Sequence, residues 1–198
     1  MKIFHHRVNQ TSKLIEVPSC DGVEIDLRSM DGRVILQHDP FLEGEDFVSW
    51  LKNWNGQELI LNIKEEGLEK RILEILDSLS IENYFFLDQS FPFMIRTLNT
   101  GNRNVAARVS DLESSETALK LDCNWIWLDC FLGDWQFLVE VVPKLHSQGK
   151  RLCLVSPELV RTDSKSELRN LQRMMKENNI YLEAVCTKVK SDWENYEI

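Results

Sequence analysis

The chain has 198 residues, 43% of them hydrophobic and 28% charged, with a formal net charge of -9 at pH 7. This length and composition are typical of one globular domain, residues 1–198, with a sizeable core. The net negative charge does not indicate the basic surface that proteins use to bind nucleic acid. No run of apolar residues approaches the roughly 20 that a membrane span needs. We therefore expect a small-molecule partner, no nucleic acid and no membrane span.

The cysteines indicate a reduced protein. They form no C-x-x-C pair, and an odd number of them cannot pair completely within one chain. Four lie in or beside apolar runs, as small buried residues do. The first residues, MKIFHHRVNQ, lack the apolar core of a signal peptide. These features predict a cytoplasmic location. The cysteines are Cys20, Cys123, Cys130, Cys153 and Cys186.

Short apolar runs recur along the whole chain and predict eight strands. They are Ile3–His6, Val23–Leu27, Leu59–Lys64, Tyr84–Asp88, Val105–Arg108, Trp125–Asp129, Leu152–Val155 and Leu182–Cys186, with Val34–His38 as an extra extended run.

Helical patterns separate many of these strands. They predict helices over Glu69–Leu79, over Asp134–His146, which Pro143 should kink or shorten, and from the capping-box spacing Ser164–Glu167 to about Asn178. Strands that alternate with helices favour an α/β fold with a parallel sheet. Eight units favour a closed (β/α)8 TIM barrel over an open sheet.

The first crossover of this barrel is unusually short. Only residues 9–20 separate the first strand from the second, which is too few for a full helix with its loops. We expect a first helix that is shortened or missing. A second subunit could cover the resulting gap, so a homo-oligomer is a further expectation.

One stretch, Gly22–Pro40, concentrates the polar residues with the clearest chemical meaning. Glu24 and Asp26 share one face of a predicted strand, because side chains two residues apart point the same way. Two adjacent carboxylates suit a hard divalent ion such as Mg²⁺ or Ca²⁺. Asp31-Gly32 is a strong turn signal, and His38-Asp39-Pro40 ends the second extended run.

The pattern G-V-E-I-D, D-G-x-V and H-D-P over this stretch resembles the glycerophosphodiester phosphodiesterase family, which has a TIM-barrel fold. His6-Arg7 also matches the family's His-Arg-Gly, although Val8 replaces the glycine. The resemblance implies that His6 and His38 form the general acid/base pair. It also implies that Arg7 binds the phosphate and that a divalent metal is bound. We prefer His6 over His5 because Arg7 follows it.

The third strand departs from the family pattern. Where the family has E-x-K, this chain has Asn62-Ile63-Lys64, so an amide replaces the third carboxylate. Asn62 is then the third metal ligand beside Glu24 and Asp26, and Lys64 binds the phosphate. Asp88 and Asp129 could supply the missing acid if they point inward. The runs LNIK, FLDQSFP and VSPEL also resemble a less-studied branch of the superfamily.

The leading interpretation is a metal-dependent phosphoric diester hydrolase for a glycerophosphodiester-like substrate. The alternative is a catalytically degenerate barrel that binds a phosphorylated ligand or serves as a subunit, as Val8, Asn62 and the short first crossover suggest. A third reading is a Schiff-base lyase that uses Lys64. It leaves the histidines and the acid pair without a role.

Overall fold

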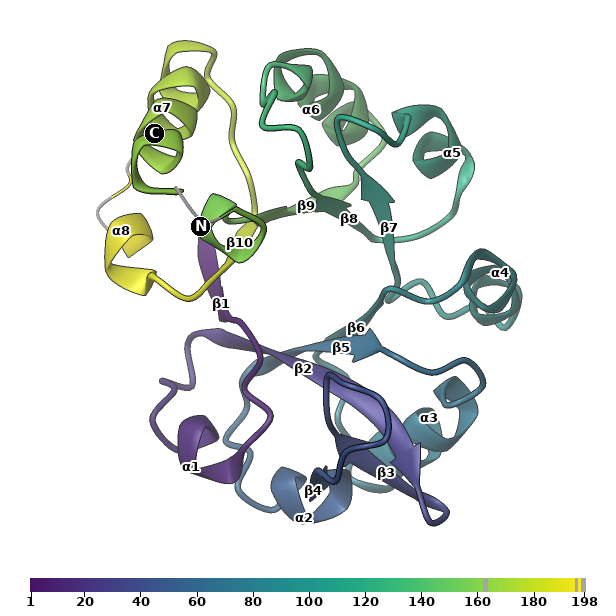
Figure 1. Cartoon of the computed structure of the whole chain (residues 1–198). Coiled ribbons are helices and arrows are strands. Elements are labelled where there is room, and N and C mark those ends of the chain that lie inside the picture. Colours follow the sequence, from purple (N-terminus) through teal and green to yellow (C-terminus); the bar gives the residue numbers. More distant parts are fainter. Residues whose placement is uncertain (162–163, 195, 197–198) are drawn as a thin grey trace. The chain divides into compact units, whose positions relative to one another are not determined.

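The computed structural model describes residues 1–161, 164–194 and 196, with the side chain of Ser164 left out. The chain divides into two compact units (Figure 1). The N-terminal unit is Phe4–Val105, and the C-terminal unit is Met1–Ile3 together with Ala106–Ile198. Strand β1 (Lys2–His5) therefore contributes its first two residues to the C-terminal unit and its last two to the N-terminal unit.

The sheet of the N-terminal unit is built around its longest strand, β2 (Gly22–Met30). This strand pairs in parallel with the end of β1 and with β5 (Glu58–Ile63), and β5 pairs in parallel with β6 (Tyr84–Leu87). On the other side, β3 (Arg33–Leu36) returns antiparallel to β2, and β4 (Glu45–Asp46) follows it. The β2–β3 turn is Asp31-Gly32, with φ angles of 50° and 75°, as its sequence predicts.

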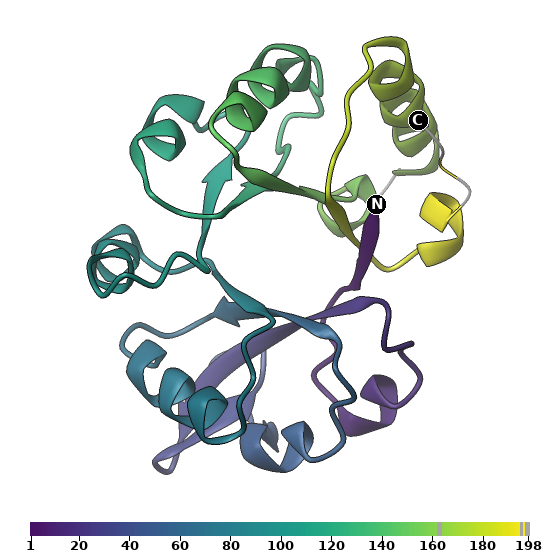
Figure 2. The ribbon, with the colours of Figure 1, turned by 180° about the vertical axis from the view of Figure 1, so that it is seen from behind.

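The N-terminal unit contains four helices. Figures 1 and 2 draw them from opposite sides. The first crossover holds a four-residue helix, α1, so its helix is shortened and not missing. Asp46 caps α2 by accepting a hydrogen bond from the Ser49 backbone N–H. The helices are α1 (Thr11–Leu14), α2 (Phe47–Leu51), α3 (Glu69–Ser78) and α4 (Phe91–Asn99).

The C-terminal unit repeats the strand–helix alternation. Its strands are β7 (Ala106–Val109), β8 (Trp125–Leu128), β9 (Arg151–Val155) and β10 (Ala184–Thr187), and neighbours pair in parallel. Its helices are α5 (Ser115–Lys120), α6 (Phe137–Ser147), α7 (Ser164–Glu177) and α8 (Lys190–Glu194), with a 3₁₀ turn at Pro157–Leu159. This is the element order of a mixed α/β fold.

All eight predicted strands are present, with ends that shift by at most two residues except in β2, which runs three residues past the predicted end at Leu27. The helix expected from Asp134 begins at Phe137, because the Asp134 carboxylate caps the preceding turn by accepting from the Gln136 N–H. Pro143 lies inside this helix. Helix α7 begins at Ser164, but the predicted capping box uses the Ser164 side chain, which lies outside the described part.

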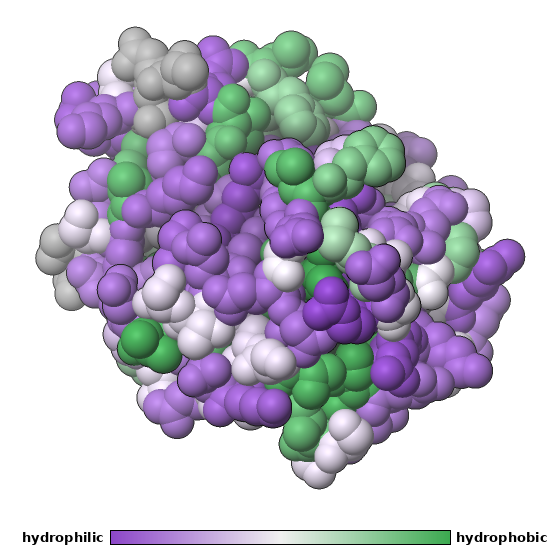
Figure 3. All heavy atoms as spheres, turned by 60° about the horizontal axis from the view of Figure 1, so that its bottom comes forward, coloured by the Kyte–Doolittle hydropathy of each residue, from purple (hydrophilic) through white to green (hydrophobic). Residues whose placement is uncertain are grey.

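The buried residues are mainly the strand residues and the inward faces of the helices. All five cysteines are free, and four of them are buried. Hydrophilic residues cover most of the face drawn in Figure 3, with smaller hydrophobic groups between them. Within the described residues, no helix is both long and apolar enough to cross a membrane.

Candidate functional site

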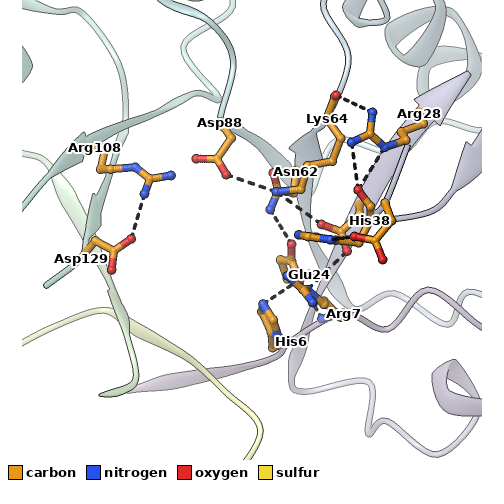
Figure 4. Close-up of polar contacts among 12 residues, drawn as sticks. His6, Arg7, Glu24, Arg28, His38, Asn62, Lys64, Asp88, Arg108 and Asp129 are labelled. Atoms are coloured by element: carbon orange, nitrogen blue, oxygen red, sulfur yellow. Dashed lines mark hydrogen bonds and ion pairs between the residues drawn. The ribbon is translucent and has the colours of Figure 1, made fainter. Parts of the chain in front are cut away.

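The predicted metal ligands meet on two neighbouring strands of the N-terminal unit. Glu24 and Asp26 lie on β2, and Asn62 lies on β5. Asp26 and Asn62 are direct partners in the parallel β2–β5 register. All three residues are buried, with exposed fractions of 1%, 0% and 6% respectively. The strand pairing therefore brings an amide and two carboxylates together at a buried position. Glu24 and Asn62 are labelled in Figure 4.

Glu24 accepts hydrogen bonds on both of its carboxylate oxygens. The Arg7 backbone N–H donates to Oε2 at 2.7 Å, and the Asn62 Nδ2 donates to Oε1 at 2.8 Å. Burial, and secondly the nearby charge of Asp26, raise the pKa of Glu24 to about 7, although both hydrogen bonds oppose this rise. Near neutral pH this carboxyl is therefore poised between its protonated and ionised forms.

Asp26 forms its side-chain hydrogen bond with Asn9. Its Oδ2 accepts a hydrogen bond of 2.7 Å from Asn9 Nδ2, and its backbone N–H donates to Asn9 Oδ1 at 2.9 Å. Its Oδ1 is buried without a hydrogen-bond partner, and so is the Oδ1 of Asn62. A buried oxygen without a hydrogen bond is energetically unfavourable unless a cation or water reaches it. The Lys64 ammonium, 3.6 Å from Asp26 Oδ1, compensates that oxygen in part.

The residues after β1 bring a histidine and an arginine to this cluster. His6 Nε2 lies 3.8 Å from Glu24 Oε2, and Arg7 Nε lies 3.9 Å from Asp26 Oδ2. Arg7 has a φ of 54°, a backbone conformation that is uncommon for residues other than glycine. His5 points elsewhere, with its Nε2 2.8 Å from Asp21 Oδ2. Of the two histidines, only His6 thus forms an ion-pair contact with Glu24.

Lys64 lies between two carboxylates at the end of β5. Its Nζ is 3.6 Å from Asp26 Oδ1 and 3.4 Å from Asp88 Oδ2. Asp88 follows β6 and has a φ of 57°. Asp88 therefore joins the site through Lys64. Asp129 belongs to the C-terminal unit, where it accepts a hydrogen bond of 2.9 Å from Arg108 Nη1.

His38 follows β3 and is fixed at both its ring and its backbone. Its Nδ1 lies 2.8 Å from Asp39 Oδ1, and its backbone oxygen accepts from the Arg28 guanidinium. The His38 contact, and then the charges of Arg7 and Arg28, hold the pKa of Asp39 below its usual value. The charges of Arg7 and Arg28 therefore both act on the His38-Asp39 segment.

The donor set fits a hard divalent cation in kind, with less charge than three acids would supply. Carboxylate and amide oxygens are the ligands that Mg²⁺ and Ca²⁺ prefer, and the two orphaned oxygens belong to Asp26 and Asn62. Across the ranges that the structure describes, no three or more His, Cys, Asp and Glu side chains gather closely enough to hold a metal. The cluster has two carboxylates, Glu24 and Asp26, and its third possible ligand is the amide oxygen of Asn62.

The sequence interpretation missed two residues of this site, Asn9 and Arg28. Arg28 carried a signal, since it shares strand parity with Glu24 and Asp26. Asn9 carried none, because its contact with Asp26 depends on the path of the chain after Arg7.

Comparison with solved structures places this fold among known enzymes. The chain superposes on the glycerophosphodiester phosphodiesterase of Thermotoga maritima with a TM-score of 0.70 and 16% identity, over 97% of this chain and 96% of that one. The glycerophosphodiester phosphodiesterase of Agrobacterium tumefaciens also gives a TM-score of 0.70, with 10% identity over 95% and 96% of the two chains. The chain has the fold of these enzymes.

The resemblance inferred from the short motifs is thereby confirmed at the level of the fold, and with it the mixed α/β class. No protein-family model matches the sequence, and no curated protein matches it. The agreement over nearly the full length of both chains is consistent with a TIM-barrel-like architecture.

Proposed function

We propose that this chain is a metal-dependent phosphoric diester hydrolase that acts on a glycerophosphodiester-like substrate. The observation that carries the proposal is the buried Glu24–Asp26–Asn62 cluster with its two orphaned oxygens. Asn62 lies one residue before the end of β5, and Asp26 is its partner on β2. The position of Asn62 agrees with the rule that barrel enzymes carry their sites at the carboxyl ends of strands. The structural likeness to two glycerophosphodiester phosphodiesterases supports the same substrate class.

Glu24, Asp26 and Asn62 would hold the cation. Bound there, Mg²⁺ or Ca²⁺ would supply positive charge to the phosphate and would favour ionisation of an attacking hydroxyl or water. Asn9 orients Asp26 for this role through its two hydrogen bonds. The Arg7 backbone N–H and the Asn62 amide orient Glu24.

In this proposal the two histidines move the protons. Asp39 Oδ1 lies against His38 Nδ1, so a proton on Nδ1 leaves Nε2 free to take or give one at the reacting oxygen. His6 stands beside Glu24 and serves the opposite transfer. Arg7 and Lys64 bind the phosphate oxygens, Arg7 through its planar guanidinium and Lys64 through a point charge.

The proposal takes residues 1–198 as one TIM-barrel domain. A reduced, cytoplasmic location agrees with the five free cysteines. A homo-oligomer remains part of the proposal because the first crossover carries only the short helix α1.

The test is hydrolysis of a panel of phosphodiesters by the purified chain, with and without Mg²⁺, Ca²⁺ or Mn²⁺. His38→Ala and Glu24→Ala are the test variants, and His146→Ala, at a half-buried histidine of the C-terminal unit, is the control. We expect metal-dependent release of alcohol in the wild type and the control, and its loss in both test variants. Turnover that survives in either test variant would contradict the assigned site.

The second candidate, a degenerate barrel that only binds a phosphorylated ligand, is favoured by the amide at Asn62. Calorimetry with the metal alone separates the two. A chain that binds neither Mg²⁺ nor Mn²⁺ and hydrolyses no diester is the binding protein. Lys64 does not favour Schiff-base chemistry, because an ammonium held between two carboxylates is an ion pair and not a free amine.

A further inference from the structure

Arg28 connects the two segments that carry His38 and Lys64. Its Nε and Nη2 donate to the His38 backbone oxygen at 3.0 and 2.9 Å. Its Nη1 donates to the Lys64 backbone oxygen at 2.9 Å. One guanidinium thus bonds to the main chain of two proposed site residues that are 26 positions apart in sequence (Figure 4).

The backbone of β2 also forms hydrogen bonds with both of these segments. The Lys64 N–H donates to the Leu27 oxygen at 3.1 Å, and the Gln37 N–H donates to the Asp26 oxygen at 3.0 Å. Beyond these two points the side chain of Arg28 bonds both segments to β2. The segment after β5 has a further contact, because Glu65 accepts hydrogen bonds from the backbone N–H and the hydroxyl of Ser29. A planar fork with donors in fixed directions can hold two carbonyl oxygens at once, whereas the single ammonium of a lysine has no such geometry.

We infer that Arg28 is a positioning residue, which sets the distance between the His38 imidazole and the Lys64 ammonium by holding the two backbones together. The inference rests on the proposed function. Arg28 itself is not proposed to touch substrate, because the three donors named above already bond to carbonyl oxygens. Misplacement of a catalytic group by about 1 Å lowers rates by about 100-fold, so the loss of this clamp should be visible in turnover.

The experiment compares Arg28→Lys with Arg33→Lys, an exposed arginine on the adjacent strand β3. Arg28→Lys keeps the positive charge near Asp39 and removes the fork. We expect kcat for the best diester of the panel to fall about 10- to 100-fold, while the affinity for Mn²⁺ stays within about threefold. Arg33→Lys should match the wild type.

A third variant controls for two other effects of Arg28→Lys, namely a lysine that still bonds to one of the two carbonyl oxygens and a disturbance of folding. Arg28→Ala, assayed with added guanidinium ion, should regain part of the lost kcat, because the free ion can reoccupy the fork site. Unchanged kcat in Arg28→Lys would overturn the inference. So would a loss of kcat that matches an equal loss of Mn²⁺ affinity, since that would be a general structural effect.

Failure of the proposed function is distinguishable from failure of this inference. If the wild type hydrolyses no diester, the imidazole resonances of His38 are followed by NMR in the same variants. Arg28→Lys should shift or broaden them and Arg33→Lys should not. Identical His38 resonances in the wild type and in Arg28→Lys would overturn the positioning role whatever the protein catalyses.

Discussion

Glu24 is a buried carboxyl that stays protonated to a higher pH in the folded protein than in the unfolded chain. Burial and the charge of Asp26 raise its pKa from 4.5 to about 7. Between these two pH values the folded protein retains a proton that the unfolded chain has released. The free energy of unfolding therefore falls as the pH rises from 4.5 to about 7, and stays at the lower value above that.

The first prediction is that Glu24→Gln removes this pH dependence. Without divalent metal, the free energy of unfolding of the wild type should fall by at most about 3 kcal/mol between pH 4.5 and 8 through this group. The variant should lack that part of the slope, because glutamine does not titrate. Urea denaturation in the presence of a chelator measures it, with the exposed Glu16→Gln as control. Equal slopes in the wild type and in Glu24→Gln would contradict the assignment.

Asn62 stands where the motif that the sequence resembles has a carboxylate, and the second prediction introduces that acid. Asn62→Asp should raise the affinity for Mg²⁺ or Mn²⁺ by about tenfold or more, because a third carboxylate adds charge to the site. The same change should lower the stability of the metal-free protein, since it buries a further charge beside Glu24. Calorimetry and denaturation measure the two effects. Asn99→Asp, on the exposed end of α4, should change neither.

At the scale of elements, β1 and β2 approach each other closely at one glycine. Phe4 and Gly22 are direct partners in this parallel pair, and a Cβ on Gly22 would lie 2.2 Å from the Phe4 ring. No side chain other than hydrogen fits there without moving the ring. The register of β1, and with it the position of His6 and Arg7, therefore depends on Gly22.

The third prediction follows from that contact. Gly22→Ala should destabilise the protein by about 1–3 kcal/mol through overpacking. In the background of Phe4→Leu, which removes the ring, the same change should destabilise the protein less. A double-mutant cycle by denaturation measures the coupling. Additive effects would show that the ring is not what Gly22 accommodates.

Elements were more predictable from the sequence than the details of the site. The alternation in β2 indicated the paired acids, and the eight apolar runs indicated the strands, because burial imposes its period on the sequence. The contacts of Asn9 with Asp26 and of Lys64 with Asp88 could not be predicted. They depend on positive φ angles at Arg7 and Asp88, which no glycine marks in the sequence. The exact strand ends also shifted, as they commonly do.

At the scale of the whole molecule, the reactivity of the cysteine thiols distinguishes the folded from the denatured chain. All five cysteines are free, and only Cys20 is exposed. The fourth prediction is that a thiol reagent such as Ellman's reagent labels one cysteine per native chain rapidly and all five after denaturation. Burial excludes the reagent from the other four, and it raises the pKa of Cys130 to about 12, which keeps that thiol protonated. Cys20→Ser should abolish the rapid phase, and several fast thiols in the native chain would contradict the described burial.

The ion pairs of Lys64 have a thermodynamic consequence for the order in which ligands bind. Its ammonium rests 3.6 Å from the same Asp26 oxygen that lacks a hydrogen-bond partner. A divalent metal ion at that oxygen repels the Lys64 ammonium. A bound phosphate attracts the ammonium away from Asp26, so that the oxygen becomes accessible to the metal ion. Metal and phosphate should therefore bind with positive cooperativity, and each must raise the affinity for the other by the same factor. Titration of Mn²⁺ with and without glycerol phosphate measures that factor, and Lys64→Met should bring it close to one.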